Sequence, residues 1–453
     1  MKVCLLNDSF PPVIDGVVNV LQNYANHLMD DYGAEVAVGT PKYPDADYDQ
    51  YPYKVYPYKS FDTEAMANGY RTGNPFAGDA VERLAEFGPD IIHTHCPASA
   101  CLVARMLRER TDAPVIMTYH TKYDIDIERA VKLKGVADEV IKAMVSNIET
   151  VDELWAVSDG AGKSLKALGY SGDYIVMNNG VDFAKGRVDA DKVAEATAGY
   201  DLPQGVPMYL FVGRLITYKG LPIILDAMKI LYDKGQDFRM VFVGKGPDDQ
   251  LLRDRAAELG IADKCIFVGP IYDRDVLRAW NTRADLFLFP STFDTNGLVV
   301  REAAACGLAS VLIKGSCAAE GISDGRNGFL IEENAESMAA FLMEASKDID
   351  HLHDVGQHAM DEIYMSWKDC VGVAYDRYQY ILERKQSGLL EARRPIMTDR
   401  LVALAATDLK YKDMRRQFRK EILGDFRETA EGMMDNVRQD LDTWSSDILN
   451  YFE

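Results

Sequence analysis

The sequence of 453 residues lacks long apolar runs, paired cysteines and an excess of basic charge. No apolar run approaches the length of about 20 residues that a membrane-spanning helix needs, so we expect any membrane contact to be peripheral. The start, MKVCLLND, is too short and too polar at its end for a signal peptide. With 50 Lys and Arg against 71 Asp and Glu, the net charge of -21 argues against general nucleic-acid binding.

Disulfide and metal-binding patterns are also scarce. The seven cysteines are an odd number, form no CxxC pair and lie mostly in apolar runs, which indicates reduced, buried thiols in a cytoplasmic protein. Acidic triplets occur at Asp45/Asp47, Asp124/Asp126 and Asp189/Asp191, none of them directly after a buried strand. Because acidic loops explain these triplets, we expect no metal.

The sequence does contain a regular alternation of short β-type and helix-type runs. It begins with KVCLLND, VVNVLQNYANHLMDDYG and AEVAVGTP, pauses in a polar stretch after about Phe183, and restarts at MYLFVGRL. Such alternation predicts a parallel sheet covered by helices on both faces, and the length of the chain favours two domains. We therefore expect an α/β fold of two doubly wound, Rossmann-like domains that face each other across a cleft.

Strand-type runs end at about Glu332, and helix-type runs follow. We expect an N-terminal domain at 1–190, a second domain at 191–365, a helix at 366–390 that returns toward the first domain, and a helical extension at 391–453. Within the extension, segment 409–423 repeats apolar residues at mostly helical spacing among basic ones. This segment can dock on anionic lipid, where each cation contributes about 1 kcal/mol, or pack on the core or on another subunit.

Glycine-rich loops between strands and helices predict sites for anionic oxygens, because backbone N–H groups and the helix dipole meet there. In SFPPVIDGVVNV the candidate is Gly16, although an ordinary loop before a helix is the simpler explanation. In VGRLITYKG, Arg214 and Lys219 lie at one rim and suit a diphosphate; otherwise both are solvated surface cations. VGKGPDD, with Gly246, matches only two glycines of the dinucleotide fingerprint, which disfavours a dehydrogenase.

The stretch STFDTNGLVVREAAACG follows the apolar run ADLFLFP and predicts a strand end, a turn and a helix from about Leu298. The amides of Leu298 and Val299 would then be available to phosphate. Glu302 can accept hydrogen bonds from a vicinal diol such as a ribose, and Asp294 from another sugar. Together these residues predict a nucleotide-sugar pocket. The alternative is that Asp294 or Asn296 caps the helix, while Glu302 only favours the helix dipole.

Taken in order, the motifs resemble those of the retaining glycosyltransferases of the GT-B fold, family GT4. The resemblance runs from Met1 to about Gln386. It rests on PPVIDGV, HTH at 93–95, TYHTKY, AVSD, NNGVD, VGRLITYKG, VGKGP, FVGP, FDTNGLVVREAAACG and DGRNGFLI. Each motif alone is weak, but together and in this order they are specific.

The resemblance implies a role for each matching residue. His120, in TYHTKY, would lie near the reacting sugar and the acceptor, and Arg214 and Lys219 would bind the diphosphate, so these three are the expected catalytic residues. Glu302, the second acid of an E-x7-E motif, would bind the ribose. The other expected donor-binding residues are Gly16, Gly246, Val268, Asp294, Thr295, Asn296, Gly297, Leu298 and Val299.

The same resemblance implies a mechanism without a bound metal or other cofactor. Enzymes of this family are described as working by front-face substitution, with the leaving diphosphate helping to deprotonate the acceptor. The sequence departs from the family at Asp294, where Glu is usual, and the shorter side chain reaches about 1 to 1.5 Å less far. This departure bears on which sugar is moved. We expect UDP-glucose or UDP-galactose as the donor.

PPVIDGVVNV and TYHTKYD are similar to the glycolipid-synthase branch of the family. That similarity implies a lipid acceptor, such as diacylglycerol or a glycolipid, at the inner face of the cell membrane, and homo-oligomer formation through the C-terminal helices is a further expectation. A soluble oligosaccharide, an envelope polysaccharide precursor or a small metabolite would share every donor motif. A sugar-nucleotide epimerase and a non-catalytic sugar-nucleotide-binding protein are further alternatives, and the presence of Arg214, Lys219 and His120 disfavours the last.

Overall fold

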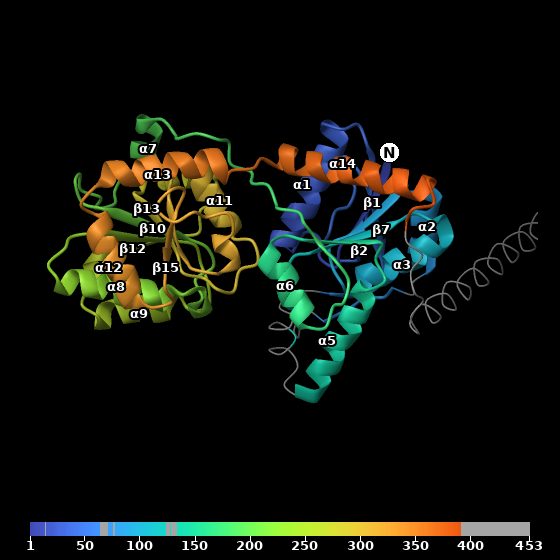
Figure 1. Cartoon of the computed structure of the whole chain (residues 1–453), viewed down its shortest axis with the longest axis horizontal. Helices are drawn as coiled ribbons and strands as arrows, with labels where there is room; N and C mark the ends of the chain where they lie inside the picture. The colour runs from blue at the N-terminus through green and yellow to red at the C-terminus, as the bar shows by residue number, and fades with distance from the viewer. Residues whose placement is uncertain (14, 64–70, 76–77, 124–126, 128–133, 391–453) are drawn as a thin grey trace, which may run out of the picture.

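The computed structural model describes residues 1–13, 15–63, 71–75, 78–123, 127 and 134–390. Two α/β domains lie side by side, each built on a parallel sheet with helices on both faces (Figure 1). This architecture confirms the expected pair of Rossmann-like domains. The expected extension at 391–453, with its segment 409–423, lies outside the described residues, and the domain bounds stay predictions.

The N-terminal sheet has seven parallel strands in the order β3-β2-β1-β6-β7-β8-β9. The strands are Lys2–Leu6 (β1), Glu35–Pro41 (β2), Lys54–Tyr58 (β3), Ile91–Thr94 (β6), Val115–Tyr119 (β7), Glu153–Ala156 (β8) and Ile175–Val176 (β9), with a small antiparallel pair at Ser60–Phe61 (β4) and Thr72–Gly73 (β5). The helices are Gly16–Asp30 (α1), Gly78–Phe87 (α2), Ser99–Thr111 (α3), Lys134–Ile148 (α5) and Asp159–Ala167 (α6). Strand order reverses between β1 and β6, where doubly wound sheets form a crevice at the strands' carboxyl ends.

The second sheet has six parallel strands in the order β12-β11-β10-β13-β14-β15. The strands are Met208–Val212 (β10), Arg239–Val243 (β11), Cys265–Gly269 (β12), Leu286–Phe289 (β13), Ser310–Ile313 (β14) and Phe329–Ile331 (β15). The α-helices are Ala190–Ala196 (α7), Leu221–Asp233 (α8), Asp249–Glu258 (α9), Arg274–Arg283 (α10), Leu298–Ala305 (α11), Ala335–Ala345 (α12) and Ile349–Glu362 (α13). Short 3-10 helices lie at Thr217–Lys219 (η1), Ala262–Lys264 (η2) and Cys317–Ala319 (η3).

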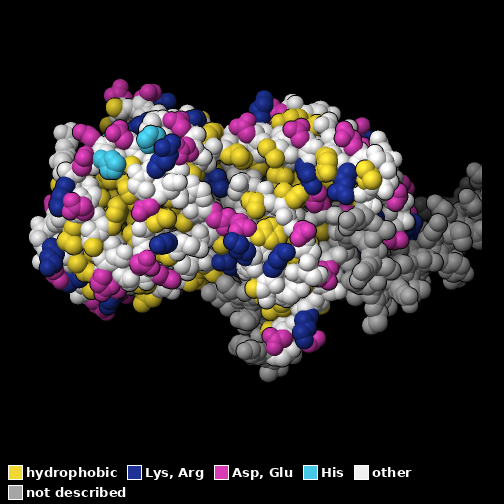
Figure 2. Space-filling model, viewed as in Figure 1, with side chains coloured by type: hydrophobic (Ala, Val, Ile, Leu, Met, Phe, Trp, Pro, Cys, Tyr) yellow, Lys and Arg dark blue, Asp and Glu magenta, His cyan; other side chains and the backbone are white. Residues whose placement is uncertain are grey.

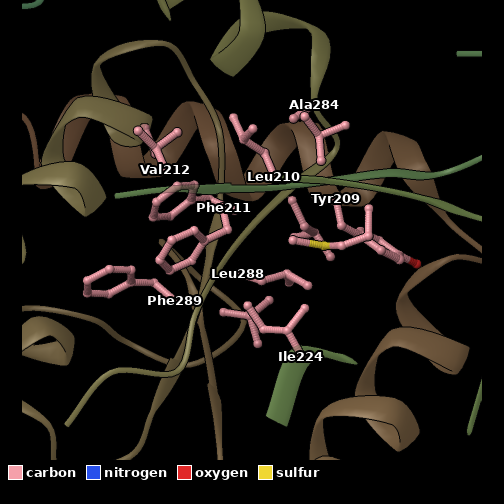
Figure 3. Packing of buried hydrophobic residues seen from close by; sticks show 14 of the residues in the cluster. Tyr209, Leu210, Phe211, Val212, Ile224, Ala284, Leu288 and Phe289 are labelled. Carbon is pink, nitrogen blue, oxygen red and sulfur yellow. The ribbon is translucent and has the colours of Figure 1, made fainter. Parts of the chain in front are cut away.

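The core of the second domain explains why these sequences form strands. Every residue of β10 and β13 is buried, as expected for central strands of a parallel sheet (Figure 3). The rings of Phe211 and Phe289 stack with their centroids 6.0 Å apart. Ile224 of α8 packs into the same cluster, so the helix and the two strands share one apolar core. The carboxyl ends of β10 and β13 are thereby fixed next to each other, and the residues that follow them form the site.

The chain crosses between the domains twice, and the two crossings are joined. Helix α14 (Trp367–Gln386) leaves the second domain and packs on α1 of the first, burying Trp367 and Tyr378 (Figure 1). Val181, on the first crossing, donates a backbone hydrogen bond to Met365 O at 3.0 Å. Gly180 permits this approach, because a Cβ there would lie 2.6 Å from Trp367 Cα.

The cysteines, the surface charges and the helix lengths complete the description of the fold. All seven cysteines are free thiols; Cys96 is half-buried and the other six are buried. Basic and acidic side chains are interspersed on the face shown in Figure 2. In the part of the chain that the structure describes, no helix combines the length and the apolar character required to cross a membrane.

Candidate functional site

Two strand ends of the second domain bring Lys219 and Asp294 together. Lys219 ends η1, after β10, and Asp294 lies in the turn after β13, which is the neighbouring strand. Lys219 Nζ donates to Asp294 Oδ1 at 2.8 Å, and Ser291 Oγ donates to Asp294 Oδ2 at 2.6 Å. Both carboxylate oxygens of Asp294 therefore have protein partners. A sugar hydroxyl that binds Asp294 has to share or replace one of them.

The helix that follows this turn begins at Leu298, as the sequence predicts. Its N-cap is Gly297, with φ 60°, and a Cβ there would lie 2.9 Å from Ala318 Cβ. No side chain of a described residue caps the helix, so the alternative in which Asp294 or Asn296 is the cap is wrong. Among the described residues the amides of Leu298 and Val299 have no hydrogen-bond partner, which leaves them available to an anion.

The loops after β10 and β11 pack backbone against backbone. Leu215 N donates to Lys245 O at 3.1 Å, and a Cβ at Gly246 would lie 2.1 Å from Leu215 O. Gly246 is thus required for the packing of the two loops, whatever it contacts in a ligand. Arg214, in the first of these loops, is exposed, and its guanidinium has no partner among the described residues. It is therefore free to bind an anion.

Glu302 has a partner that the sequence did not indicate. Arg274 Nη2 donates to Glu302 Oε1 at 2.5 Å, although the two residues are 28 positions apart. Burial raises the pKa of the Glu302 carboxyl, and the Arg274 charge opposes that rise. Arg274 also lies 3.7 Å from Asp182 and 4.5 Å from the ring centre of Phe183, both on the chain crossing between the domains.

A hollow of about 450 Å³ adjoins this ion pair. It is lined by Arg274 and Asp182, by polar residues of α1 (Asn19, Gln22, Asn23 and Asn26) and by 51–53. Gly16, the first residue of α1, is exposed, and a Cβ there would meet no atom within 4 Å. Asp15 caps this helix by accepting from Val18 N at 2.7 Å, as expected for an ordinary loop before a helix.

The N-terminal domain contributes His120 from the end of β7. The residue is buried, its Nε2 lies 3.0 Å from His95 Nδ1, and burial lowers its pKa to about 3, so the imidazole is neutral at physiological pH. The His120 carbonyl accepts a hydrogen bond from Thr295 Oγ1 at 2.5 Å. The expected sugar loop of the second domain therefore touches the histidine of the first.

Further hydrogen bonds join the domains around this contact. Ser158 Oγ donates to Thr295 O at 2.5 Å, and Asn296 Nδ2 donates to Val157 O at 2.5 Å. Glu320 accepts from Asp159 N at 2.7 Å and from Gly160 N at 2.5 Å, at the start of α6. The side chains of Thr295 and Asn296 thus hold the domains together, and their expected contact with the donor sugar stays a prediction. Nothing in the sequence marked Glu320, whereas Ser158 lies in the AVSD motif.

The site residues gather into two groups on the second domain. Arg214, Lys219, Asp294 and the start of α11 belong to loops that follow adjacent strands, and the Thr295 contact adds His120. Glu302 turns instead to Arg274. The two acids of the E-x7-E-like motif therefore face different cations, which does not favour a catalytic carboxylate pair. Val268 is half-buried in the edge strand β12, and its expected place near the base stays a prediction.

Comparisons with known proteins identify the family of the chain. Residues 14–185 match the model of "Glycosyltransferase Family 4", and residues 194–361 match that of "Glycosyl transferases group 1". The chain is 29% identical over 311 residues to D-inositol 3-phosphate glycosyltransferase 2 of Catenulispora acidiphila, which covers 65% of this chain and 71% of that protein. It is 24% identical over 312 residues to alpha-monoglucosyldiacylglycerol synthase of Streptococcus pneumoniae, covering 68% and 70%.

A solved structure supports the fold. HepE of Anabaena, crystallised in complex with UDP, superposes with a TM-score of 0.67 at 17% identity, over 84% of this chain and 100% of HepE. The two family models together span most of the chain, and they meet between the two observed sheets. The chain therefore belongs to the group 1, family 4 glycosyltransferases, which have the GT-B fold.

Proposed function

We propose that the protein transfers a hexose from UDP-glucose or UDP-galactose, with retention of the anomeric configuration, to a hydroxyl group of a lipid such as diacylglycerol or a glycolipid. The observation that carries this proposal is the convergence of one anion site and one buried histidine. The guanidinium of Arg214, the ammonium of Lys219 and the amides of Leu298 and Val299 belong to loops at one rim, and no described residue pairs with the guanidinium or the amides. The Thr295 contact brings His120 to the same rim from the other domain.

This arrangement suits the departure of a nucleoside diphosphate. As the acceptor oxygen bonds to the anomeric carbon, the bond to the diphosphate oxygen breaks, and the acceptor proton passes to that leaving oxygen on the same face. Arg214, Lys219 and the amide groups stabilise the negative charge that develops on the diphosphate. Because these groups supply the positive charge, we propose that no metal takes part. Glu302 would bind the ribose, and Arg274 would keep its carboxylate ionised.

The donor and acceptor classes find support in the relatives. HepE was crystallised with UDP, and the pneumococcal relative is named for the synthesis of a glucosylated diacylglycerol. A soluble, phosphorylated polyol is the second candidate acceptor, because the relative from Catenulispora is named for transfer to D-inositol 3-phosphate. Both candidates use the same donor side of the site, so the acceptor has to be determined by assay.

Nucleotide release and product structure test the proposal. The full chain would be incubated with UDP-glucose, UDP-galactose or GDP-mannose, together with diacylglycerol in detergent, D-inositol 3-phosphate, or no acceptor. We expect release of UDP that depends on the lipid, and a product whose anomeric proton coupling shows the configuration of the donor. Release that depends only on the soluble acceptor would select the second candidate. No release from any donor with any acceptor would defeat the transferase proposal for these substrates.

Arg214→Ala tests the anion site. Losing one preorganised group that stabilises the leaving diphosphate is expected to lower kcat by about 10²- to 10³-fold. The matched control is Arg255→Ala, which removes an exposed arginine of α9 that pairs with Asp226. Equal rates for the two variants would remove Arg214 from the mechanism.

Peripheral membrane attachment and oligomerisation are proposed for the extension. Sedimentation with anionic liposomes would compare the full chain with a chain ending at 390, at low and high salt. We expect binding of the full chain that weakens with salt, since a basic segment loses its attraction as charges are screened. Binding that is absent, or unaffected by salt and truncation, would refute the attachment. Light scattering of the same two proteins shows whether the extension joins two copies.

A further inference from the structure

His95 and His120 form a buried pair of imidazoles. His95 follows β6 and His120 follows β7, and these two strands are neighbours in the N-terminal sheet. Their rings stack at 25° with the centroids 5.2 Å apart, and His95 Nδ1 lies 3.0 Å from His120 Nε2. Both rings are buried, and burial lowers the pKa of each. Both are therefore neutral at physiological pH, and one proton is shared in the hydrogen bond between them.

His95 differs from His93, which points to the same side of β6 two residues earlier. His93 uses both ring nitrogens, with Tyr378 OH at 2.6 Å from Nδ1 and Thr118 Oγ1 at 2.7 Å from Nε2. His95 uses only Nδ1. Its Nε2 is buried and has no hydrogen-bond partner among the described residues. Within the described part of the chain, the hydrogen bond to His120 is thus the only one that the His95 side chain makes.

This pattern is poorly explained by stability. A buried polar atom without a partner is costly, and an apolar side chain of similar size would fill the same space without that cost. In native proteins such atoms call for a specific explanation, and a role in a functional site is one. His93 needs no such explanation, because its two hydrogen bonds tie β6 to α14 and to β7.

We propose that His95 is a positioning residue for His120. This inference rests on the proposed function. His95 holds the His120 ring by its hydrogen bond to Nε2, so that Nδ1 of His120 is the nitrogen left for the substrate. In the described part of the chain, Nδ1 of His120 has no hydrogen-bond partner, whereas Nε2 has His95. Thr295 holds the backbone carbonyl of the same residue, so His120 is held at its ring by its own domain and at its carbonyl by the other.

A double-mutant cycle tests this role. His95→Leu keeps a buried side chain of similar volume and removes the hydrogen bond to His120. We expect kcat to fall about tenfold, which is the contribution of one orienting hydrogen bond. The KM for the donor and the Tm should change little. In a His120→Ala background, His95→Leu should cost almost nothing more, because it acts through the ring that is gone. His95→Asn, whose amide can take the place of Nδ1, should recover most of the rate.

His93→Asn is the matched control. It should lower Tm, because His93 links three elements, while keeping a rate closer to wild type than His95→Leu does. If His95→Leu transfers sugar at the wild-type rate, or slows the His120→Ala enzyme as much as it slows the wild type, the positioning role is wrong. Loss of Tm in His95→Leu without loss of kcat would mean that His95 is structural.

A second measurement does not need transfer activity. In NMR spectra of protein isotope-labelled only at histidine, the His120 ring signals are assigned by their loss in His120→Ala. These signals should shift and broaden in His95→Leu and stay sharp in His93→Asn. Unchanged His120 signals in His95→Leu would overturn the inference. If the wild-type chain transfers no sugar but His95→Leu still shifts the His120 signals, the proposed function is wrong and the positioning of the His120 ring by His95 stands.

Discussion

Removing the carboxylate of Glu320 should open the two domains. Its two oxygens accept from Asp159 N and Gly160 N, the first amides of α6, across the domain boundary. A side-chain cap contributes about 0.5–2 kcal/mol, and a negative charge at a helix N-terminus about 0.3–1 kcal/mol. Glu320→Ala therefore costs the closed form about 2 kcal/mol, which shifts the closed-to-open ratio by about 30-fold.

The shift can be measured as a distance. Spin labels at Lys142→Cys in α5 and Lys347→Cys after α12 report the separation of the domains, and the native cysteines should label poorly because six of the seven are buried. We expect the distance distribution to broaden toward longer values in Glu320→Ala, while Glu344→Ala, on the exposed face of α12, leaves it unchanged. A Glu320→Ala distribution identical to that of the wild type would refute the reasoning.

Gly160→Ala attacks the same contact from the other domain. A Cβ at Gly160 would lie 2.9 Å from Glu320 Oε1 and 2.6 Å from Cys317 Sγ, so one side has to give way. The variant should open the domains as Glu320→Ala does, and combining the two should add little, because both break one contact.

Two further predictions concern stability. Below a pH of about 6.5, histidines of the unfolded chain bind protons that the buried, neutral histidines of the folded chain do not. The free energy of unfolding is therefore full above that pH and falls as the pH drops. His120 alone, whose pKa is lowered to about 3, should reduce the free energy of unfolding by about 2 kcal/mol between pH 7.5 and 5.0. Urea unfolding at both pH values checks this, and His120→Asn should reduce the loss. Gly246→Ala should lower the free energy of unfolding by about 2 kcal/mol or more, since its Cβ would meet Leu215 O, whereas Gly16→Ala, which meets nothing, should leave it unchanged. Equal thermal unfolding of the two glycine variants would contradict that account.

Much of the fold and the rim of the site could be predicted, because their signals are local. The run MYLFV is apolar throughout, as a central parallel strand has to be, and it became β10. The start of α11 at Leu298 followed from the turn residues before it. The proximity of Lys219 to Asp294 required only that strands β10 and β13 be neighbours.

The contacts that escaped prediction depend on how distant segments pack. Glu320 and Asp159 are 161 residues apart and meet only because the two domains close on each other. The pair of Arg274 and Glu302 depends on how α10 and α11 lie side by side, which no local pattern encodes. The contact between His95 and His120 was within reach, because both histidines end adjacent parallel strands, but it needed the strand order first.

The joined chain crossings restrict how the molecule can move. Val181 is hydrogen-bonded to Met365 at the point where the chain crosses between the domains in both directions. We therefore expect the two crossings to act as a single hinge. Sliding or twisting of one domain past the other would break that hydrogen bond, whereas rotation about the hinge would keep it. In such a rotation, residues close to the hinge are displaced little, and residues far from it are displaced most. Since α14 packs on the first domain, this helix moves with the first domain although it follows the second in the sequence.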